Sequence, residues 1–528
     1  LSHLSFADDI VVFTDGSPAS LVGTLQVFDE FASMSGLRIN VAKSTVFAAG
    51  RGRRALEEAA TNSGLSVSTL PIKYLGLPLT TKIMTRNDYE PLTTKIRNRL
   101  LSWTSKALSY AGRLLLIKSV IASITNFWCA AFCLPQACID EIESMCSAFL
   151  WSGSPNNTSR AKIAWEEVCC PREEGGLGIR RVKDVSTVFM LKLIWCLFSN
   201  TASLWVSWVR RYLLRDAVLW DVKDTGLGSW AWRKLLRIRD IAKPFVRWNI
   251  GDGNTVRFWT DLWHPSGRLI DIAGESGTQK LGIGRDRRIS DLLVGGAWRF
   301  RRCRDQNLQS MIHDVIGFPI TLSSGRDTVL WKRRDDEFGN KFSASETWHQ
   351  IRSSRSRVQW SKIVWFSQGV PRYAFITWLA IRDRLSTGHR TSQWGQPQRC
   401  LYCGEPDETR DHLFFACPFT FTLWLKVVGN LFGIDPDPDW DTTLERLQNG
   451  TYDRLTFILL RLVFQVSVYF IWIERNDRKH SNRAKSVEQL AKLIDKAVRN
   501  SLSSTHYFLK PKLKGIMCRW FEAHPHRE

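Results

Sequence analysis

The chain opens on two apolar runs separated by a polar break. In Leu4–Phe13 the sequence LSFADDIVVF places Asp8 and Asp9 between residues typical of strands. Neighbouring side chains point to opposite faces of a straight strand, but at a tight turn both can approach one site. The pattern therefore predicts a β-hairpin with a pair of carboxylates at or beside its turn.

A helix and a short strand are predicted next. Ser17 is a good N-cap, Pro18 suits the first helical position, and Gly36 is a natural stop. Apolar residues between them recur at helical spacing. Leu37–Ile39 is expected to form a short strand, so the beginning of the chain has an α+β pattern.

Helical periodicity dominates two later segments. Between residues 96 and 128 the apolar positions form two stripes, with Gly112 near their join. Leu455–Ile473 is apolar enough to suggest a membrane span, but Arg461 stands near its middle and Gln465 lies one turn later on the same face. Because a central arginine disfavours insertion by about 2.5–3.5 kcal/mol, we expect a buried amphipathic helix and no membrane partner. The stripes consist of Ile96, Leu100 and Trp103, then Ile117, Ile121, Ile124 and Trp128.

The middle of the chain has a weaker pattern. Gly175, Gly176 and Gly178 do not follow the spacing of a dinucleotide-binding loop, so tight turns are the better interpretation. The chain has 24 Trp, each of which could stack on a base. Most of them fall at helical or strand spacing, so we expect most of them in the core.

The charge balance indicates a polyanionic partner. Lys and Arg number 73 against 51 Asp and Glu, a net charge of +22, which is typical of nucleic-acid-binding proteins. A soluble basic protein without such a partner is the alternative. The excess is concentrated partly in 81–120, with eight Lys or Arg against two acids, and in 451–528, with 15 Lys or Arg against seven acids.

A length of 528 residues with 44% hydrophobic content indicates several globular units.

Cysteine usage and the first residues bear on location. The 12 Cys mostly stand singly in apolar runs, which suits a reducing compartment better than a disulfide framework. The first residue is Leu, inside a strand-like run, and no signal peptide precedes it. We therefore expect an intracellular protein that is not secreted, and we interpret the chain as a piece of a longer protein.

Asp8 and Asp9 are candidate magnesium ligands. Mg²⁺ prefers oxygen ligands and takes few protein carboxylates, with phosphates and water supplying the rest. Two such ions can stabilise both the attacking and the leaving oxygen of a phosphoryl displacement. The alternative is an Asx turn, in which the Asp side chain serves local hydrogen bonds.

A second candidate metal site lies in the C-terminal half. The spacing C-x2-C-x8-H-x4-C is formed by Cys400, Cys403, His412 and Cys417. Three thiolates and one imidazole complete a tetrahedral zinc site. Because no position is left open, the ion would be structural. Chance placement of three of the 12 Cys beside a His is the alternative.

Several motifs resemble, in the same order, those of plant non-LTR (LINE-type) retrotransposon reverse transcriptases. FADD between apolar strands is similar to their metal-binding hairpin. GLRINVAKSTVF (36–47) resembles the next palm segment and IKYLGLPL (72–79) the primer grip. LSYAGRLLLIKSVI (108–121) and GGLGIRRV (175–182) resemble the region after the palm. Together the matches extend over nearly the whole chain.

The resemblance implies a role for each matching residue. Asp8 would coordinate the catalytic Mg²⁺ ions, and Asp9 would be its less directly involved neighbour. Lys43 matches a lysine that assists the departure of pyrophosphate. The primer-grip turn is matched by Tyr74, Leu75 and Gly76. For Tyr74, simple packing in the core would be an equally good explanation.

The zinc-binding domain that follows the polymerase in this family is also resembled. The resemblance rests on the Cys/His cluster and on three segments that precede it: FSASETWHQI, WSKIVW and PRYAFITWLAIRDRLSTGHR. In this interpretation Arg372 and Arg390 would contact the backbone of RNA or DNA. Trp378 and Trp394 are expected in the core.

The predicted fold class is α+β: a truncated polymerase palm remnant, a mainly helical thumb and connection region, and a small zinc-binding domain. The expected segments are the palm remnant with the FADD hairpin (1–80), a helical thumb-like region (81–150), a connecting region (151–340), the zinc-binding domain (341–430) and a basic helical C-terminal tail (431–528).

These features predict the C-terminal part of a LINE-type RNA-directed DNA polymerase that binds nucleic acid. Its cofactors would be structural Zn²⁺ and, in the intact family enzyme, catalytic Mg²⁺. Its partners would be an RNA template and a DNA target or primer in the nucleus, with dNTPs as the only small-molecule substrates. The family takes a further palm Asp and its fingers from upstream of the hairpin, so we expect this chain alone to be catalytically incomplete. The alternative is a non-enzymatic zinc-containing nucleic-acid-binding protein, or an inert relic of a decayed retrotransposon.

Overall fold

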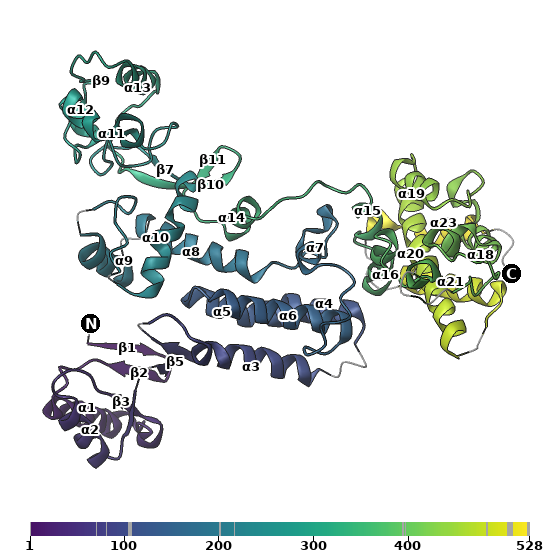
Figure 1. Ribbon diagram of the computed structural model, residues 1–528, viewed down its shortest axis with the longest axis horizontal. Helices are drawn as coiled ribbons and strands as arrows, with labels where there is room; N and C mark the ends of the chain where they lie inside the picture. The colour runs from purple at the N-terminus through teal and green to yellow at the C-terminus, as the bar shows by residue number, and fades with distance from the viewer. Residues whose placement is uncertain are drawn as a thin grey trace. The chain divides into compact units, whose positions relative to one another are not determined.

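The chain forms two compact units, and Figure 1 labels their main helices and strands. Unit 1 consists of Leu1–Lys95, Thr125–Ile139 and Val185–Ile351; unit 2 consists of Ile96–Ile124, Asp140–Asp184 and Arg352–Glu528. Helices predominate, with small sheets of two or three strands, which is consistent with the predicted α+β class. The computed structural model describes residues 2–69, 71–80, 82–103, 108–199, 202–215, 217–226, 228–392, 395, 398–481, 484–503 and 510–524.

The first helix has the predicted caps. α1 (Pro18–Ser35) begins after Ser17, whose side chain accepts a hydrogen bond from the Ser20 N–H, and it ends at Gly36 with φ 75°. Glycine adopts this left-handed conformation without strain. Only Leu21 of its apolar stripe is buried, in a small cluster that α1 shares with the following helix.

The prediction of a strand at Leu37–Ile39 is wrong. Residues 37–40 are irregular, and strand β3 is Thr45–Phe47, after a 3₁₀ turn at Val41–Lys43. β3 pairs in parallel with β4 (Ser66–Ser68), across the intervening helix α2 (Arg53–Asn62). A strand forms where a partner strand is available for pairing. The apolar triplet Leu37–Ile39 by itself does not show whether such a partner exists.

The rest of unit 1 has two hydrophobic cores. Its elements are α8 (Val182–Ser199), α9 (Leu204–Val209), α10 (Trp230–Ala242), β7 (Val246–Asn249), α11 (Leu269–Leu281), α12 (Ile289–Leu292), β8 (Leu293–Val294), β9 (Ala297–Trp298), α13 (Gln306–Gly317), β10 (Thr328–Arg334), β11 (Glu337–Gly339) and α14 (Ala344–Ile351). One core joins α8, α9 and α10 to the sheet of order β11-β10-β7, with Trp331 fully buried. The other surrounds Trp259 and Trp263 and includes residues of α11 and α13. These tryptophans lie in the core, as predicted.

Unit 2 is a helical body built around α16. The helices that lie wholly or partly in it are α3 (Arg86–Ser102), α4 (Tyr110–Leu116), α5 (Ala122–Ala131), α6 (Gln136–Ser152), α7 (Trp165–Cys169), α15 (Ser361–Val364), α16 (Pro371–Ile381), α17 (Gly388–Ser392), α18 (Pro418–Val428), α19 (Trp440–Asn449), α20 (Arg454–Ser481), α21 (Val487–Leu502) and α23 (Ile516–Glu522). Phe375 of α16 stacks on Tyr110 with ring centroids 4.7 Å apart, and Trp378 stacks on Trp151 at 6.4 Å. Helices from three of the expected segments therefore share one core, while the boundaries proposed for those segments stay a prediction.

The predicted apolar stripes and core tryptophans can be compared with burial. Ile96, Leu100 and Ile121 are buried, as the stripes predicted. Gly112 lies within α4 and not at a join between helices: α3 ends at Ser102 and α4 begins at Tyr110. Trp378 is fully buried, whereas Trp394 lies outside the described residues.

The glycine-rich segment forms tight turns, as predicted. Gly175 and Gly178 have φ values of 84° and 71°, in the left-handed region that glycine tolerates. A Cβ at Gly176 would lie 2.0 Å from the Cys170 carbonyl oxygen, so no other residue fits there. The Gly175 carbonyl accepts a hydrogen bond of 2.8 Å from the Trp378 indole, which joins this turn to α16.

Among the residues that the structure describes, two helices have the length and apolar composition of a membrane span: Tyr110–Ala131 and Arg454–Ser481. There are up to three candidates if the bent pair 182–199 and 204–214 is counted as one span. In Arg454–Ser481, 72% of the apolar window is buried inside the protein. Gln465 is fully buried and donates hydrogen bonds of 2.8 and 2.9 Å to the carbonyls of Ile363 and Val364. This helix is therefore packed within unit 2 through a polar stripe, as the sequence predicted.

Candidate functional site

The carboxylate pair lies at the tip of the hairpin between β1 (His3–Phe6) and β2 (Asp9–Val12). Ala7 and Asp8 form the two-residue turn, and Asp9 is the first residue of β2. Ala7 has φ 51°, in the left-handed region that favours glycine, so the turn is strained. Such strain is often found at functional sites, and here it holds two consecutive carboxylates at an exposed tip.

The surroundings of the hairpin are apolar and open. Phe6, Ile10 and Phe13 are 64%, 49% and 49% exposed. The side chains of Asp8 and Asp9 have no hydrogen bond or ion pair with another described residue. The described residues contain one group of three or more clustered metal-ligating side chains, and it lies elsewhere. Within the described part of the chain, the hairpin thus offers two carboxylates and no third protein ligand, which falls short of a two-metal arrangement.

Lys43 is the last residue of the 3₁₀ turn before β3. Its backbone N–H donates a hydrogen bond of 3.1 Å to the Asn40 side chain, and its own side chain is exposed. The role implied for Lys43 at the pyrophosphate stays a prediction.

The segment that resembles a primer grip is a second tight hairpin. β5 (Ile72–Tyr74) pairs antiparallel with β6 (Leu77–Leu79). Leu75 and Gly76 between them have φ values of 52° and 76°. Two positive φ values are typical of the turn whose twist matches that of the flanking strands. The predicted turn is present, and its contact with a primer stays a prediction.

The Cys/His cluster is built from two short turns that meet. In the first, Gly404 has φ 83° and its N–H donates to the Cys400 carbonyl at 2.9 Å, while the Cys400 N–H donates to the Glu405 carbonyl at 2.8 Å. In the second, the Cys417 N–H donates to the His412 carbonyl at 2.8 Å, and Cys417 immediately precedes α18. Backbone hydrogen bonds therefore position ligands from two parts of the sequence.

The distances between the side chains fit a tetrahedral zinc ion. The Sγ atoms of Cys400 and Cys417 are 3.9 Å apart, and Cys403 Sγ lies 3.2 Å from His412 Nε2. One ligand atom from each of the four residues lies within 4.8 Å of the others. Zn–S bonds of about 2.3 Å in a tetrahedron place two sulfurs about 3.8 Å apart. Four protein ligands close the coordination shell, so the ion would be structural.

The two buried thiols, Cys400 and Cys417, share a hydrogen bond that shifts their pKa values in opposite directions. A hydrogen bond with Cys417, together with burial, raises the pKa of the Cys400 thiol. The same hydrogen bond lowers the pKa of Cys417. Backbone N–H groups, among them those of Tyr402 and Phe419, also favour the thiolates. Zinc binding would require both thiols to lose their protons, so the affinity for the ion should rise with pH.

Residues that the sequence did not single out support the first turn. The Tyr402 hydroxyl donates to the Ile471 carbonyl at 2.7 Å. The Arg478 guanidinium lies 4.6 Å from the Tyr402 ring centroid, and the Tyr402 ring stacks on Phe419 at 4.8 Å. In the sequence, these contacts are indicated only by an aromatic residue between the first two cysteines and by the Arg-rich end of the long helix. Neither feature has a fixed spacing from the metal ligands, so neither could be used to predict the contacts.

The two arginines expected at nucleic acid differ in their contacts. Arg372 is exposed, with its guanidinium 4.8 Å from the ring centroid of Tyr373 and 5.6 Å from that of Tyr469. Arg390 is partly buried and donates a hydrogen bond of 2.8 Å to the Asp383 carbonyl. Arg372 is thus available to a ligand, whereas Arg390 holds the turn after α16. Their contact with a nucleic acid backbone stays a prediction.

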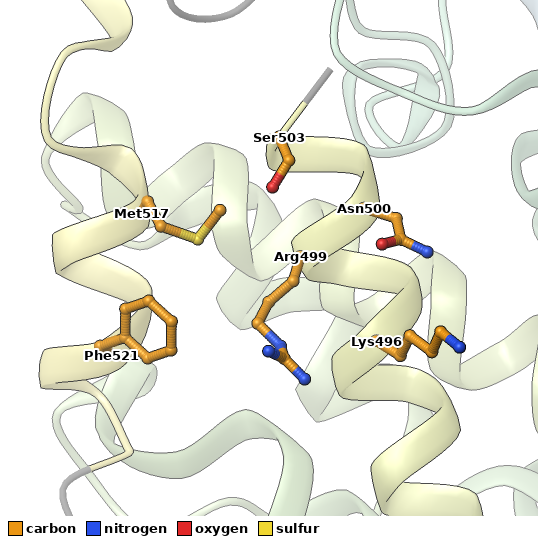
Figure 2. Close-up of a pocket in the computed structure, with 6 residues that line it drawn as sticks. All are labelled: Lys496, Arg499, Asn500, Ser503, Met517 and Phe521. Atoms are coloured by element: carbon orange, nitrogen blue, oxygen red, sulfur yellow. The ribbon is translucent and has the colours of Figure 1, made fainter.

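An open pocket of about 380 Å³ lies between α21 and α23. Figure 2 shows Arg499 of α21 and Met517 and Phe521 of α23 pointing into the space between the helices. Asp495 holds Arg499 through an ion pair of 2.8 Å, and Phe521 is 54% exposed. The lining is therefore basic on one side and apolar on the other. It consists of Lys496, Arg499, Asn500, Ser503, Met517 and Phe521.

Comparison with known proteins supports part of the resemblance. Residues 342–424 match the family described as zinc-binding in reverse transcriptase, and this range includes all four residues of the Cys/His cluster. The chain is 25% identical over 368 residues to a "Putative ribonuclease H protein" of Arabidopsis thaliana, in a match that covers 67% of this chain. It is 23% identical over 135 residues to an uncharacterized mitochondrial protein of the same organism, covering 25% of this chain and 88% of that protein.

These matches support a reverse-transcriptase-related element with a structural zinc site. The chain spans 58% of the length of the first of the two relatives. The family match and the cluster geometry coincide at residues 400–417, so two independent observations support the zinc assignment.

Proposed function

We propose that this chain is the zinc-containing, nucleic-acid-binding part of a LINE-type RNA-directed DNA polymerase from a plant element. The observation that carries the proposal is the agreement between the matched family and the Cys/His geometry in residues 400–417. The ordered FADD, primer-grip and GGLG motifs support the assignment to a LINE-type polymerase.

The partners of the chain would be an RNA template and a DNA target or primer, in the nucleus. A net charge of +22 supports a polyanionic partner. The exposed Arg372 and the basic side of the α21–α23 pocket supply cations within unit 2. Because phosphate contacts carry little sequence information, binding should be largely independent of sequence.

In this proposal zinc has a structural role and the hairpin is an incomplete catalytic element. Zn²⁺ held by the three cysteines and His412 would fix the loop that precedes α18. Asp8 would coordinate Mg²⁺, with Asp9 as its less directly involved neighbour, but polymerisation requires a further carboxylate that the described part of this chain does not bring to them.

The test is the salt dependence of binding by the full chain to RNA and to single-stranded DNA. Neutralising several phosphates releases counterions, so the logarithm of the binding constant should fall linearly with the logarithm of salt concentration, by about 0.7 per phosphate contacted. No binding at low salt, or a binding constant independent of salt, would overturn the proposal.

A matched pair of variants locates the contact in the C-terminal pocket. Lys496 lines the pocket and has no acidic partner among the described residues, whereas Lys426 is paired with Glu488 at 3.4 Å. Lys496→Gln should weaken binding and reduce the salt slope by up to about one phosphate contact. Lys426→Gln should change the slope less, because the Lys426 charge is already offset.

A further inference from the structure

One helical segment of unit 1 turns its aromatic residues outward. α9 (Leu204–Val209) continues into a π-helical turn, Arg210–Leu214. Val206 and Val209 are fully buried in the core shared with α8 and α10. Three aromatic side chains of the segment are exposed instead: Trp205, Trp208 and Tyr212 are 36%, 49% and 56% exposed and form what we call the aromatic face.

This orientation is the reverse of the one that burial alone would select. Tryptophan buries more apolar area than valine, so a helix packed only for stability would place Trp inside. Elsewhere the chain follows that rule, since Trp259, Trp331, Trp424 and Trp520 are almost fully buried. Clustered exposed aromatic side chains mark interaction sites more often than isolated ones do.

The aromatic face is interleaved with positive charge. Trp208 and Tyr212 have ring centroids 5.7 Å apart, and the Arg211 guanidinium lies 5.7 Å from the Tyr212 centroid. Arg211 and Arg215 are exposed, and the described residues provide no acidic partner for either of them. Neighbouring rings and exposed guanidinium groups match the two components of a single strand, its bases and its phosphates.

We propose that the aromatic face, with Arg211 and Arg215, is a stacking platform for single-stranded nucleic acid. Bases would stack on Trp208 and Tyr212, and the arginines would contact the adjoining phosphates. The site rests on the proposed function, because it assumes that the chain binds nucleic acid, and it adds a specific base-dependent contact in unit 1. Binding there would be tolerant of sequence, since every base has a stackable ring.

A lipid surface fits this face less well. An interfacial helix presents a continuous apolar side to the acyl chains. Here Ser207 and Arg211 are exposed in the same segment as the aromatic side chains, so its exposed surface is not continuously apolar. The positive charge of Arg211 and Arg215 is also favourable for the phosphates of a nucleic acid strand, the partner that the proposed function gives this chain.

The test compares an oligothymidylate of about 12 nucleotides with an abasic oligonucleotide of the same length, each bound to the full chain. Wild-type protein should prefer the oligothymidylate. The double variant Trp208→Ala, Tyr212→Ala should lose at least about tenfold in affinity for it while keeping its affinity for the abasic strand. Trp208→Phe with Tyr212→Phe should restore most of the preference.

Phe127→Ala is the matched control. Phe127 is 51% exposed, and its helix, α5, has no Lys or Arg, so its removal should leave both affinities unchanged. If the wild type binds both strands and the alanine double variant keeps the preference for bases, the platform is refuted and the proposed function stands. If the wild type binds neither strand, both fail. If the double variant instead loses binding to phosphatidylserine vesicles with its oligonucleotide affinities unchanged, the face is a lipid contact and the platform is refuted.

Discussion

Arg475 of α20 and Glu408 form an ion pair of 2.7 Å whose side chains are 2% and 0% exposed. Glu408 lies between Cys403 and His412, and the same carboxylate oxygen accepts a hydrogen bond of 2.8 Å from the Gly388 N–H. The pair therefore ties the longest helix of unit 2 to the loop that carries the metal ligands. Removing one partner would leave the other charge buried without compensation.

Glu408→Gln should destabilise unit 2 by about 3–5 kcal/mol. The reason is that the Arg475 guanidinium would remain buried without a counter-charge. Urea unfolding of the full chain, followed by zinc release into a chromogenic chelator, measures the effect on the zinc-binding part directly. Glu488→Gln is the control, since it removes a carboxylate from an exposed pair with Lys426 and should hardly change the midpoint. Equal midpoints for the two variants would show that the buried pair does not stabilise the zinc loop.

The purified chain should contain one tightly bound zinc. Elemental analysis should find one ion per chain in the wild type and a substoichiometric amount in the double variant Cys403→Ser, Cys417→Ser. Because ion binding and folding of such a site are coupled, the double variant should also lose local structure. Cys518→Ser is the control, since Cys518 is exposed and lies outside the cluster. Full zinc retention by the double variant would exclude these ligands.

Local chemistry accounts for the parts of the fold that the sequence predicted. The caps of α1 at Ser17 and Gly36 depend on neighbouring residues, and so does the hairpin at Asp8. The ligand cluster spans only residues 400–417, which makes its spacing informative. The buried helix Arg454–Ser481 was recognisable because Arg461 and Gln465 fall on one helical face.

Contacts between distant residues account for what the sequence did not predict. Phe375 stacks on Tyr110, and Arg475 pairs with Glu408, although neither contact leaves a periodic signal. The parallel partner of β3 likewise lies beyond α2, so Leu37–Ile39 looked as suitable for a strand as Thr45–Phe47 did. The outward aromatic face of α9 was missed because helical spacing alone does not show which side of a helix is buried.

Asp261 should give unit 1 an unusual pH dependence. The carboxyl is buried and accepts a hydrogen bond of 2.7 Å from the Arg257 N–H, and burial raises its pKa to about 6 from an ordinary value of 3.8. Between these two pH values the folded state binds more protons than the unfolded state. The contribution of Asp261 to stability is therefore favourable at low pH, falls as pH rises through this window, and stays unfavourable above about pH 6.

Asp261→Asn removes this titration. The difference in unfolding free energy between wild type and variant should change by on the order of 3 kcal/mol from pH 4 to pH 7, in favour of the variant at pH 7. Asp305→Asn is the control. The hydrogen bond with Lys280 lowers the pKa of Asp305, so the difference in unfolding free energy between wild type and this variant should change with pH in the opposite direction. A free-energy difference between the wild type and Asp261→Asn that does not vary with pH would contradict the raised pKa.

Asp8 and Asp9 present a pair of carboxylates that this chain should not be able to use alone. Two-metal phosphoryl transfer needs carboxylates that converge from more than one strand. The nearby acids in the sequence are unsuitable: Asp15 accepts a hydrogen bond of 2.9 Å from the Ser17 N–H at the start of α1, and Asp29 lies on the exposed side of that helix. We therefore expect weak Mg²⁺ binding and no templated primer extension by the 528-residue chain.

The measurement is extension of a primed RNA template with Mg²⁺ and dNTPs, with Asp8→Asn assayed beside the wild type. Both proteins should give only background incorporation. Metal binding is measured separately, by the effect of Mn²⁺ on nuclear relaxation. The wild type should bind Mn²⁺ weakly at the hairpin, and Asp8→Asn should bind it more weakly still. Extension by the wild type that Asp8→Asn abolishes would mean that another carboxylate of this chain reaches the hairpin in the presence of substrate. Such a result would also predict that the exposed apolar side chains Phe6 and Ile10 become covered when primer and template bind.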